Sequence, residues 1–563
     1  MLSLPFFLSQ PWLTSPFALA GVSAFLAATM VYFAVAVHRD SVPALGGGIF
    51  PLATNGYLYL VNQQSFIYRL RHAFRSTNIT RFYVGAMKVY AITGAHNMQA
   101  MFRTSASISS DIFIMLVIEH LWGAPADDLK MLGADKTGRL KTPIQEGSKK
   151  TPVVMDENKR IWYGFHKIVH EYLAQTAATN ALAASFQRLF AQKLGERFPV
   201  VGEWTDVRVF EFLKRDMAES AIVSLLGTRI LEVNGGGDEF IRLFWEMDAV
   251  LISLLWGLPH WMIRSAVAKR DALNAACTRY LEAAWAEFDW DGPEAHADWE
   301  PVFGSPFGRH FAKWIKEVGL SPKAMGGALA GVGVGGQNAN TVPIATWCIM
   351  ELAKDPATFH AIRDEVSTTW VTDTATDKRI IDAQKLLALP LLQSVYSETM
   401  RLHVSINITR EVVDPIMMEG YQLQKGGVIQ ASTEIAHLDE RVWAVEGHPA
   451  SEFWAARHVQ YVDGTDEATG KTIQVPQFSI AGKTNNFFPF GGGVTMCPGR
   501  HFAKQEIMVA VAMLVSRFDF EFVEWTNMDG TRSDRPARNN EKYSGAASVP
   551  PDRDLRLRWK RLW

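Results

Sequence analysis

The chain has 563 residues and 48% of them are apolar, which is enough to bury a large core. Its 56 Lys and Arg nearly balance its 58 Asp and Glu, so the charge gives no support to a nucleic-acid partner. The three cysteines, an odd and sparse number, argue against a disulfide framework and for a reducing compartment.

Residues 17–37 form an apolar run without a charged side chain. A run of roughly twenty such residues spans a bilayer as a helix. No Lys or Arg precedes it and His38-Arg39 follow it, which predicts a short lumenal N-terminus at 1–16 and a cytosolic remainder. A cleaved signal peptide is the alternative, but the basic segment that it requires is missing. We expect an uncleaved transmembrane anchor at 17–37, a glycine-rich linker at 38–50 and one large domain at 51–563.

Short β-type runs at 82–84 and 88–92 flank Gly85 and predict a hairpin. From 156 to about 284, apolar residues recur three and four apart, which predicts a mostly helical body. The fold class is therefore mainly α with a small β region. Residues 251–262 are apolar but too few to span a bilayer. They belong either to the buried core or to a surface that dips into a membrane.

A long helix is predicted to begin at Ser321-Pro322, because Ser suits the N-cap and Pro the first helical position. Asp355-Pro356 would end it. Each glycine inside a helix costs roughly 1 kcal/mol relative to alanine, so a cluster of them needs a reason. The reason is the close approach of either a bulky planar group or a second helix; the glycines are Gly331, Gly333, Gly335 and Gly336.

Near the C-terminal end, a glycine-rich loop carries one cysteine into a helix, in the sequence NFFPFGGGVTMCPGRHFA from Asn486 to Ala503. A thiolate at Cys497 would be favoured by the positive end of the helix dipole and could bind a metal ion. Glycines at 491–493 and 499 let the backbone turn sharply and lie against a flat group, on which Phe490 can pack. A buried free cysteine beside a glycine turn is the alternative reading. The pattern Phe-Gly-x-Gly-x-x-x-Cys-x-Gly resembles the haem-binding signature of the cytochrome P450 superfamily.

This resemblance covers the chain from about Gly48 to its C-terminus, together with the anchor. It implies the cytochrome P450 fold behind one transmembrane helix. It also implies haem b (heme) with Cys497 as axial thiolate ligand, and loop contacts from Phe490, Gly493 and Gly499. Electrons from NADPH would arrive through a separate flavoprotein, an NADPH–cytochrome reductase. The implied location is the endoplasmic reticulum membrane, single-pass, with the catalytic domain in the cytosol.

In this superfamily the long helix commonly carries an acid followed by threonine, which deliver protons during oxygen activation. Here those positions hold Ala339 and Asn340, and Thr341 follows. The sequence Ala-Asn-Thr-x-Pro resembles the sterol 7-hydroxylase and prostacyclin synthase branch, and a fungal member is possible. An Asn amide donates and accepts but cannot ionise, so protons would pass through water or Thr341.

Three functions follow from these residues. The first is a membrane-bound monooxygenase that oxidises a lipophile such as a sterol or terpenoid. The second is an isomerase or dehydratase that needs neither O2 nor a reductase, as Ala339-Asn340 would allow. The third is a non-enzymatic haem or lipid binder.

The resemblance also implies structural and haem-edge residues. Glu398 and Arg401, three apart on a helix, would join Arg457 in a buried triad that holds the cysteine loop. Arg410 would bind a haem propionate. The family's Trp and basic residue would fall within 162–167, with His166 or Lys167 in place of the usual Arg, unless this is a solvated helix face. Thr495 stands where most relatives have a propionate-binding Arg.

Overall fold

The computed structural model describes residues 41–46, 51–104, 107–141, 144–145, 148–152, 160–373, 377–465 and 470–563. They form two compact units: the described part of Met1–Thr93 with Glu411–Gln430, and the described part of Gly94–Arg410 with Ala431–Trp563. The predicted anchor at 17–37 and the segment before it lie outside the described residues. Across the described ranges, no helix combines the length and the apolar character that crossing a membrane requires.

The first unit contains the predicted hairpin. Strands β1 (Ile79–Val84) and β2 (Met87–Ile92) pair in antiparallel register around Gly85, whose φ of +58° favours glycine. Its other elements are α3 (Pro51–Val61), α4 (Gln63–Ala73), β10 (Ile416–Met418), β11 (Tyr421–Leu423) and β12 (Val428–Ser432), and β12 follows β2 in the sheet order. Part of the predicted linker also packs here, because Val42 and Leu45 are buried and the Arg81 amide donates to the Pro43 carbonyl at 2.8 Å.

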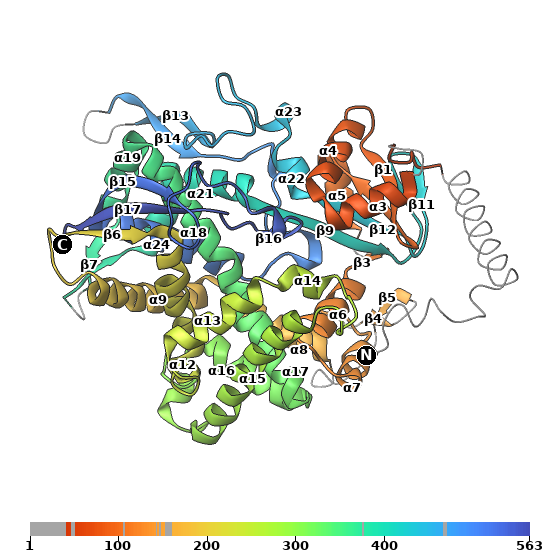
Figure 1. Ribbon diagram of the computed structural model, residues 1–563, viewed down its shortest axis with the longest axis horizontal. Coiled ribbons are helices and arrows are strands. Elements are labelled where there is room, and N and C mark those ends of the chain that lie inside the picture. Colours follow the sequence, from red (N-terminus) through yellow and green to blue (C-terminus); the bar gives the residue numbers. More distant parts are fainter. Residues whose placement is uncertain are drawn as a thin grey trace, which may run out of the picture. The chain divides into compact units, whose positions relative to one another are not determined.

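The second unit is mostly helical, as predicted, and its helices are drawn in Figure 1. They are α5 (Ala95–Arg103), α6 (Asp111–His120), α7 (Ala126–Ala134), α8 (Ile161–Leu173), α9 (Thr176–Arg197), α10 (Val209–Phe212), α11 (Ala218–Leu226), α12 (Arg229–Glu232), α13 (Gly237–Asp248), α14 (Leu251–Leu255), α15 (Arg264–Glu287), α16 (Pro306–Val318), α17 (Pro322–Ala328), α18 (Gly336–Lys354), α19 (Pro356–Ser367), α20 (Ala383–Ala388), α21 (Pro390–His403), α22 (Thr433–His437), α23 (Glu440–Trp443) and α24 (Arg500–Arg517). Two π-helical segments, η2 (Leu213–Met217) and η4 (Leu329–Gly335), continue α10 and α17, and short 3-10 turns are η3 (Pro293–His296), η5 (Thr484–Asn486), η6 (Gly493–Thr495) and η7 (Glu541–Tyr543).

Small sheets border these helices. Strand β9 (Val404–Val412) pairs with β16 (Ala546–Ser548) and with β3 (Ile108–Ser109), and its last residues belong to the first unit. Strand β17 (Asp554–Arg561) lies between β15 (Phe518–Thr526) and β6 (Trp204–Arg208). The remaining strands form two-stranded ribbons: β4 (Ile144–Gln145) with β5 (Ser148–Pro152), β7 (Trp370–Thr372) with β8 (Arg379–Ile381), and β13 (Val459–Thr465) with β14 (Thr472–Phe478).

The long helix runs without a break from α17 through η4 to α18, as predicted. Ser321 caps its start by accepting from the Ala324 amide, and Asp355 follows its last residue. A Cβ at Gly327 or Gly331 would lie 2.0 Å or 2.6 Å from atoms of Trp122, so close packing explains these glycines. Gly335 and Gly336 differ, because the nearest atoms to a Cβ there belong mainly to their own helix. Gly331 is thus explained by packing against Trp122, which follows α6, whereas the close approach of a planar group to Gly335 and Gly336 stays a prediction.

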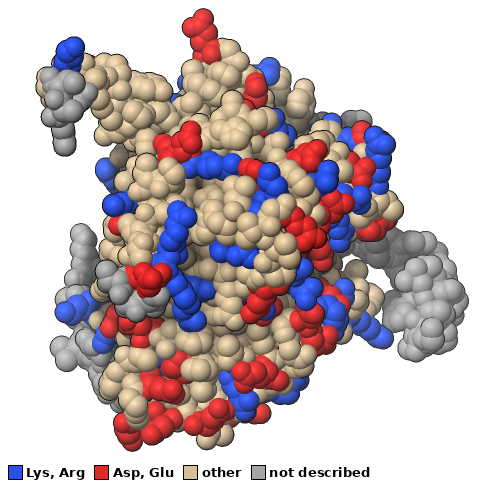
Figure 2. All heavy atoms as spheres, turned by 90° about the vertical axis from the view of Figure 1, so that its left-hand side faces the viewer, with Lys and Arg blue, Asp and Glu red and all other residues tan. Residues whose placement is uncertain are grey.

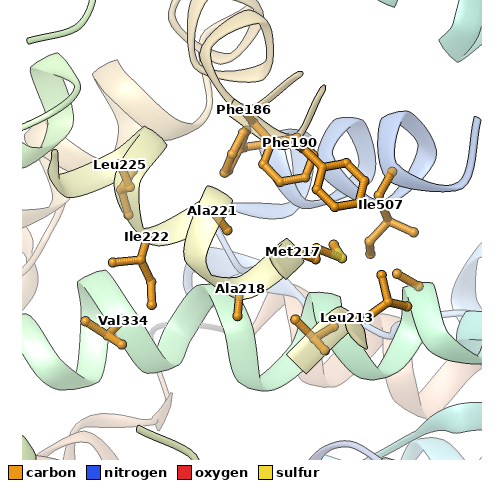
Figure 3. Close-up of a cluster of buried hydrophobic side chains, with 14 of the residues drawn as sticks. Phe186, Phe190, Leu213, Met217, Ala218, Ala221, Ile222, Leu225, Val334 and Ile507 are labelled. Carbon is orange, nitrogen blue, oxygen red and sulfur yellow. The ribbon is translucent and has the colours of Figure 1, made fainter. Parts of the chain in front are cut away.

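In the core of the second unit, α9 and α11 pack against the long helix and α24 (Figure 3). Phe186 and Phe190 of α9 are fully buried there, beside α11 and the long helix. The other labelled side chains are Leu213, Met217, Ala218, Ala221, Ile222, Leu225, Val334 and Ile507. Helices α18 and α24 are thereby held in one packed body, and these are the helices that carry the candidate site.

The apolar segment 251–262 is not buried as a whole. Leu254 is buried, but Trp256, Trp261 and Met262 are 45%, 69% and 55% exposed. The buried-core reading of this segment is therefore wrong at its C-terminal end. Elsewhere the surface is mixed: the face in Figure 2 carries acidic and basic side chains among a majority of uncharged ones.

Candidate haem site

The cysteine loop folds back on itself before α24. The Cys497 amide donates to the Phe490 carbonyl at 3.0 Å, and the Gly491 amide donates to the Phe488 carbonyl at 3.0 Å. Cys497 is exposed, whereas Cys277 and Cys348 are buried. The loop therefore presents one accessible thiol just before a helix.

Three glycines shape this loop in different ways. Gly491 and Gly493 have φ of +72° and +69°, values that side chains disfavour. A Cβ on Gly492 would lie 2.5 Å from the ring of Phe102. Gly499 is not a turn glycine, because its φ is −73°; a Cβ there would lie 3.8 Å from the Cys497 Sγ. That is an ordinary van der Waals distance, so neither the backbone conformation nor the neighbouring sulfur requires glycine at position 499.

Two opposing effects act on the thiol. Desolvation raises the pKa of Cys497 above its ordinary value, while the amides of Gly499 and Arg500 and the Arg500 charge lower it. The helix N-terminus lowers the pKa of Cys497, as expected, but desolvation raises that pKa by more. A coordinated metal ion deprotonates a thiol outright, so binding of the metal would supply the missing stabilisation.

Arg410 reaches the cysteine loop. Its Nη2 donates to the Thr495 hydroxyl at 2.5 Å and to the Gly492 carbonyl at 3.3 Å. Desolvation and the charge of Arg139 lower the pKa of Arg410 to about 10. Two guanidinium groups in a desolvated place repel each other, and an anion between them would relieve that repulsion.

Arg139 was not a candidate from the sequence. Its charge acts on Arg410, and it also contacts the predicted aromatic segment at 162–167. Its guanidinium lies 5.7 Å from the ring centroid of Trp162, and Asp111 pairs with it at 3.6 Å. Burial, His170 and Arg139 lower the pKa of His166. Lys167 is exposed. The basic residue beside the Trp is thus supplied by a loop 23 positions earlier in the chain, which no spacing rule would indicate.

The long helix presents Asn340 on its accessible side. Gly336 is exposed and Asn340 is half-buried, although most of α18 is buried. The Asn340 Nδ2 donates to the Gly336 carbonyl at 3.4 Å, and its Oδ1 accepts from the Ser548 amide at 3.1 Å. Pro343 has no N–H, so the carbonyl of Ala339 lacks its helical partner. Polar groups therefore gather where Gly336 and Asn340 reach the surface of the helix, which we call the open stretch of α18.

Thr341 lies on another side of the helix. It is buried, and its hydroxyl donates to Glu506 Oε1 of α24 at 3.0 Å. Gln337 Nε2 donates to the other oxygen of Glu506 at 3.3 Å. Burial raises the pKa of Glu506 to about 7, although both hydrogen bonds lower it. The sequence analysis missed this acid, yet a lone Glu in the apolar run of α24 was a visible signal. Asn340 and Thr341 are thus not brought together on one surface.

The predicted triad is present and fully buried. Glu398 binds Arg401 through both oxygens at 2.8 Å, and its Oε1 accepts from Arg457 Nε at 2.6 Å. The two arginines also donate to backbone carbonyls of residues 437–452, which fixes the segment that precedes the cysteine loop. His458, which the sequence analysis missed, lies 3.3 Å from Glu398. Burial alone would raise the pKa of Glu398, but its cationic partners hold it at about 2.

These residues fit a haem. Cys497 offers an accessible sulfur, and Val494 and Met496 beside it are 51% and 41% exposed, as an apolar macrocycle would require. The guanidinium groups of Arg410 and Arg139 carry the charge that pairs with its propionates. Gly336 is exposed and has no side chain, so a flat group can approach the open stretch of α18 closely. Fold and site together define a haem-thiolate protein.

Comparison with known proteins agrees. The Cytochrome P450 family profile matches residues 334–535. Cytochrome P450 monooxygenase calL of Penicillium decumbens is 44% identical over 92% of this chain and 93% of its own length. Cytochrome P450 7A1 of Sus scrofa is 29% identical over 39% of this chain and 42% of its own. The solved structure of retinoic acid bound cyanobacterial CYP120A1 covers 93% of this chain and 100% of its own, with a TM-score of 0.59 and 15% identity, and shows the same fold. The chain belongs to the cytochrome P450 family and is a monooxygenase of that family.

Proposed function

We propose that this monooxygenase is membrane-bound and oxidises a lipophilic substrate such as a sterol, a terpenoid or a similar natural product. The balance is one O2, two electrons and two protons per substrate: one oxygen atom enters the substrate and the other leaves as water. NADPH supplies the electrons through a partner NADPH–cytochrome reductase. The single observation that carries the proposal is the accessible thiol of Cys497, held beside a basic pair that suits the haem propionates.

Cys497 is the proposed iron ligand. When bound, a haem with a thiolate ligand supplies the activation of O2. The chain's own residues prepare the place: the glycine loop presents the sulfur, and Arg410 and Arg139 neutralise the propionates. The buried triad keeps the preceding segment fixed. Asn340, on the open stretch of α18, would hold water or a substrate oxygen by hydrogen bonds.

The membrane part of the proposal rests on two segments. The apolar run at 17–37 has the length of an anchor. The exposed Trp256, Trp261 and Met262 form an apolar surface that suits a bilayer interface. We place the protein in the endoplasmic reticulum membrane with the domain in the cytosol. Removing residues 1–37 should release the protein from membrane pellets only in part, and full release would assign the binding to the anchor alone.

The substrate class rests on a partial likeness. Cholesterol 7-alpha-monooxygenase of Cricetulus griseus is 27% identical over 39% of this chain, and the motif around Asn340 points to the same branch. Screening lipophiles for a spin-state change of the haem would identify ligands directly. The proposed substrate class is wrong if unrelated aromatics change the spin state of the haem and a collection of sterols and terpenoids does not.

An isomerase or dehydratase is the second candidate, because the acid position holds Ala339 and Asn340 cannot ionise. The two candidates differ in what they consume. Product should form only when NADPH, reductase and O2 are all present. Turnover that is indifferent to all three would reject the proposed electron supply and favour the second candidate.

A further inference from the structure

The segment from Tyr543 to Ser548 contacts two helices, α13 and α18, that are far apart in the sequence. At one end, the side chain of Tyr543 interacts with the carboxyl of Asp248, the last residue of α13. Asp248 is buried, with 6% of its surface exposed, and burial raises its pKa to about 7. At the other end, the Ser548 amide donates to Asn340 Oδ1 of α18 at 3.1 Å.

The segment between these ends is tied to its neighbour along its length. The Asn407 amide donates to the Gly545 carbonyl at 3.0 Å, and the Gly545 amide donates to the Ser405 hydroxyl at 2.9 Å. Strand β16 then pairs with β9, with Ser548 opposite Val404. A shift of Tyr543 would therefore be passed along a hydrogen-bonded strand and not absorbed by a loose loop.

The Ser548 amide also decides how the Asn340 side chain is oriented. A backbone N–H can only donate, so the atom that faces it must be the carboxamide oxygen. The nitrogen is then directed to the Gly336 carbonyl, to which it donates one of its two hydrogens at 3.4 Å. One N–H remains for a partner on the open stretch of α18. Without Ser548, the carboxamide could turn over and present its oxygen instead.

We propose that the Ser548 main-chain amide orients Asn340, and that the contact of Tyr543 with Asp248 anchors this strand to α13. Ser548, Tyr543 and Asp248 are then positioning residues for the distal side of the haem, and the end of α13 controls the orientation of Asn340 from a distance. This inference rests on the proposed function only in that the haem lies against the open stretch of α18.

The test uses the carbon monoxide adduct of the full-length, haem-loaded, reduced protein. Its C–O stretching frequency reports hydrogen-bond donors on the distal side and needs neither substrate nor reductase. Asn340→Ala sets the shift expected when the donor is lost. Ser548→Pro removes the amide hydrogen while also fixing φ and adding a ring, and should shift the band in the same direction. Ser548→Ala keeps that hydrogen and should leave the band unchanged.

Tyr543→Phe tests the anchor without touching the strand's backbone. It should shift or broaden the band, whereas Tyr461→Phe, a change at a tyrosine that is 68% exposed, should not. With substrate, Tyr543→Phe should lower the product formed per NADPH by roughly two- to tenfold, the factor of one ordinary hydrogen bond, with more peroxide released and haem content unchanged.

The outcomes distinguish a failure of the positioning role from a failure of the haem site. If Asn340→Ala shifts the band and neither Ser548→Pro nor Tyr543→Phe does, the positioning role is wrong while the haem site stands. If Ser548→Pro takes up no haem, Tyr543→Phe alone decides. If the wild-type protein forms no carbon monoxide adduct, the proposed function fails, and this inference fails with it.

Discussion

The buried triad gives the sharpest prediction on stability. Replacing Glu398 with Gln keeps the shape of the side chain but leaves Arg401 and Arg457 buried without a counter-charge. The pKa of Glu398 is about 2, compared with an ordinary value of 4.5. A difference of about two and a half pKa units corresponds to about 3 kcal/mol, since one unit is worth 1.36 kcal/mol. Breaking a buried ion pair costs about 3–5 kcal/mol in other proteins, which agrees.

The sign of the pH dependence follows from the same shift. Because the pKa of Glu398 is lower in the folded chain, its stabilisation is present above about pH 4.5 and is lost as the pH falls towards 2. The variant has no such group. The difference in unfolding free energy should therefore be constant from about pH 7 to 5 and should shrink below about 4.5.

Urea unfolding of the full-length holoprotein in detergent, followed by circular dichroism, measures this difference. The matched control is Glu239→Gln. Glu239 and Arg242 repeat the same residue types at the same spacing, but their side chains are about half exposed. Exposed pairs contribute little, so this control should not change measurably. A Glu398→Gln loss below about 1 kcal/mol at pH 7, or one that equals the control, would refute the triad as the element that fixes the segment before the cysteine loop.

Three further predictions concern the site. Cys497→Ala should abolish the thiolate-type carbonyl spectrum while far-ultraviolet circular dichroism stays unchanged; retention of that spectrum would exclude Cys497 as the ligand. Arg410→Gln should lower haem content, and more so at low haem supply, because a propionate loses its partner; the exposed Lys167→Gln is the control and should have no effect. Glu506→Gln should stabilise the protein above pH 7 and make no difference at pH 4.5, because the pKa of Glu506 is raised from 4.5 to about 7 and its ionisation is a cost that Gln avoids. A variant whose unfolding free energy follows the wild type at both pH values would show that Glu506 does not titrate in this range.

The sequence predicted the elements whose signals are local. A cap and a proline at Ser321-Pro322 marked the start of the long helix, and Gly85 marked the hairpin turn. The triad was predictable because Glu398 and Arg401 lie one helical turn apart and resemble a known pattern. The anchor and the domain boundaries at 16, 37 and 50 stay predictions.

What the sequence could not supply were partners brought together by the tertiary fold. Arg139 beside Trp162, His458 beside Glu398 and Ser548 beside Asn340 are separated by 23 to 208 positions, and no periodicity links them. The helix glycines show the same limit, because only the neighbours in space reveal which glycines are packed and which are open. The backbone amides at the start of α24 lower the pKa of Cys497, in the direction that the sequence indicated, whereas the desolvation that raises it depends on the folded surroundings.

Two of the places where this chain departs from the usual pattern of the family it resembles are held by contacts from another segment. Thr495 replaces a loop arginine, and its hydroxyl instead holds Arg410 from a neighbouring strand at 2.5 Å. Asn340 replaces a threonine, and a backbone amide holds its oxygen. In both places the contact is supplied by a segment that is distant in the sequence. Substitutions that restore the common residue singly, such as Thr495→Arg, should therefore disturb the site, since they add a charge beside Arg410 instead of replacing a missing one.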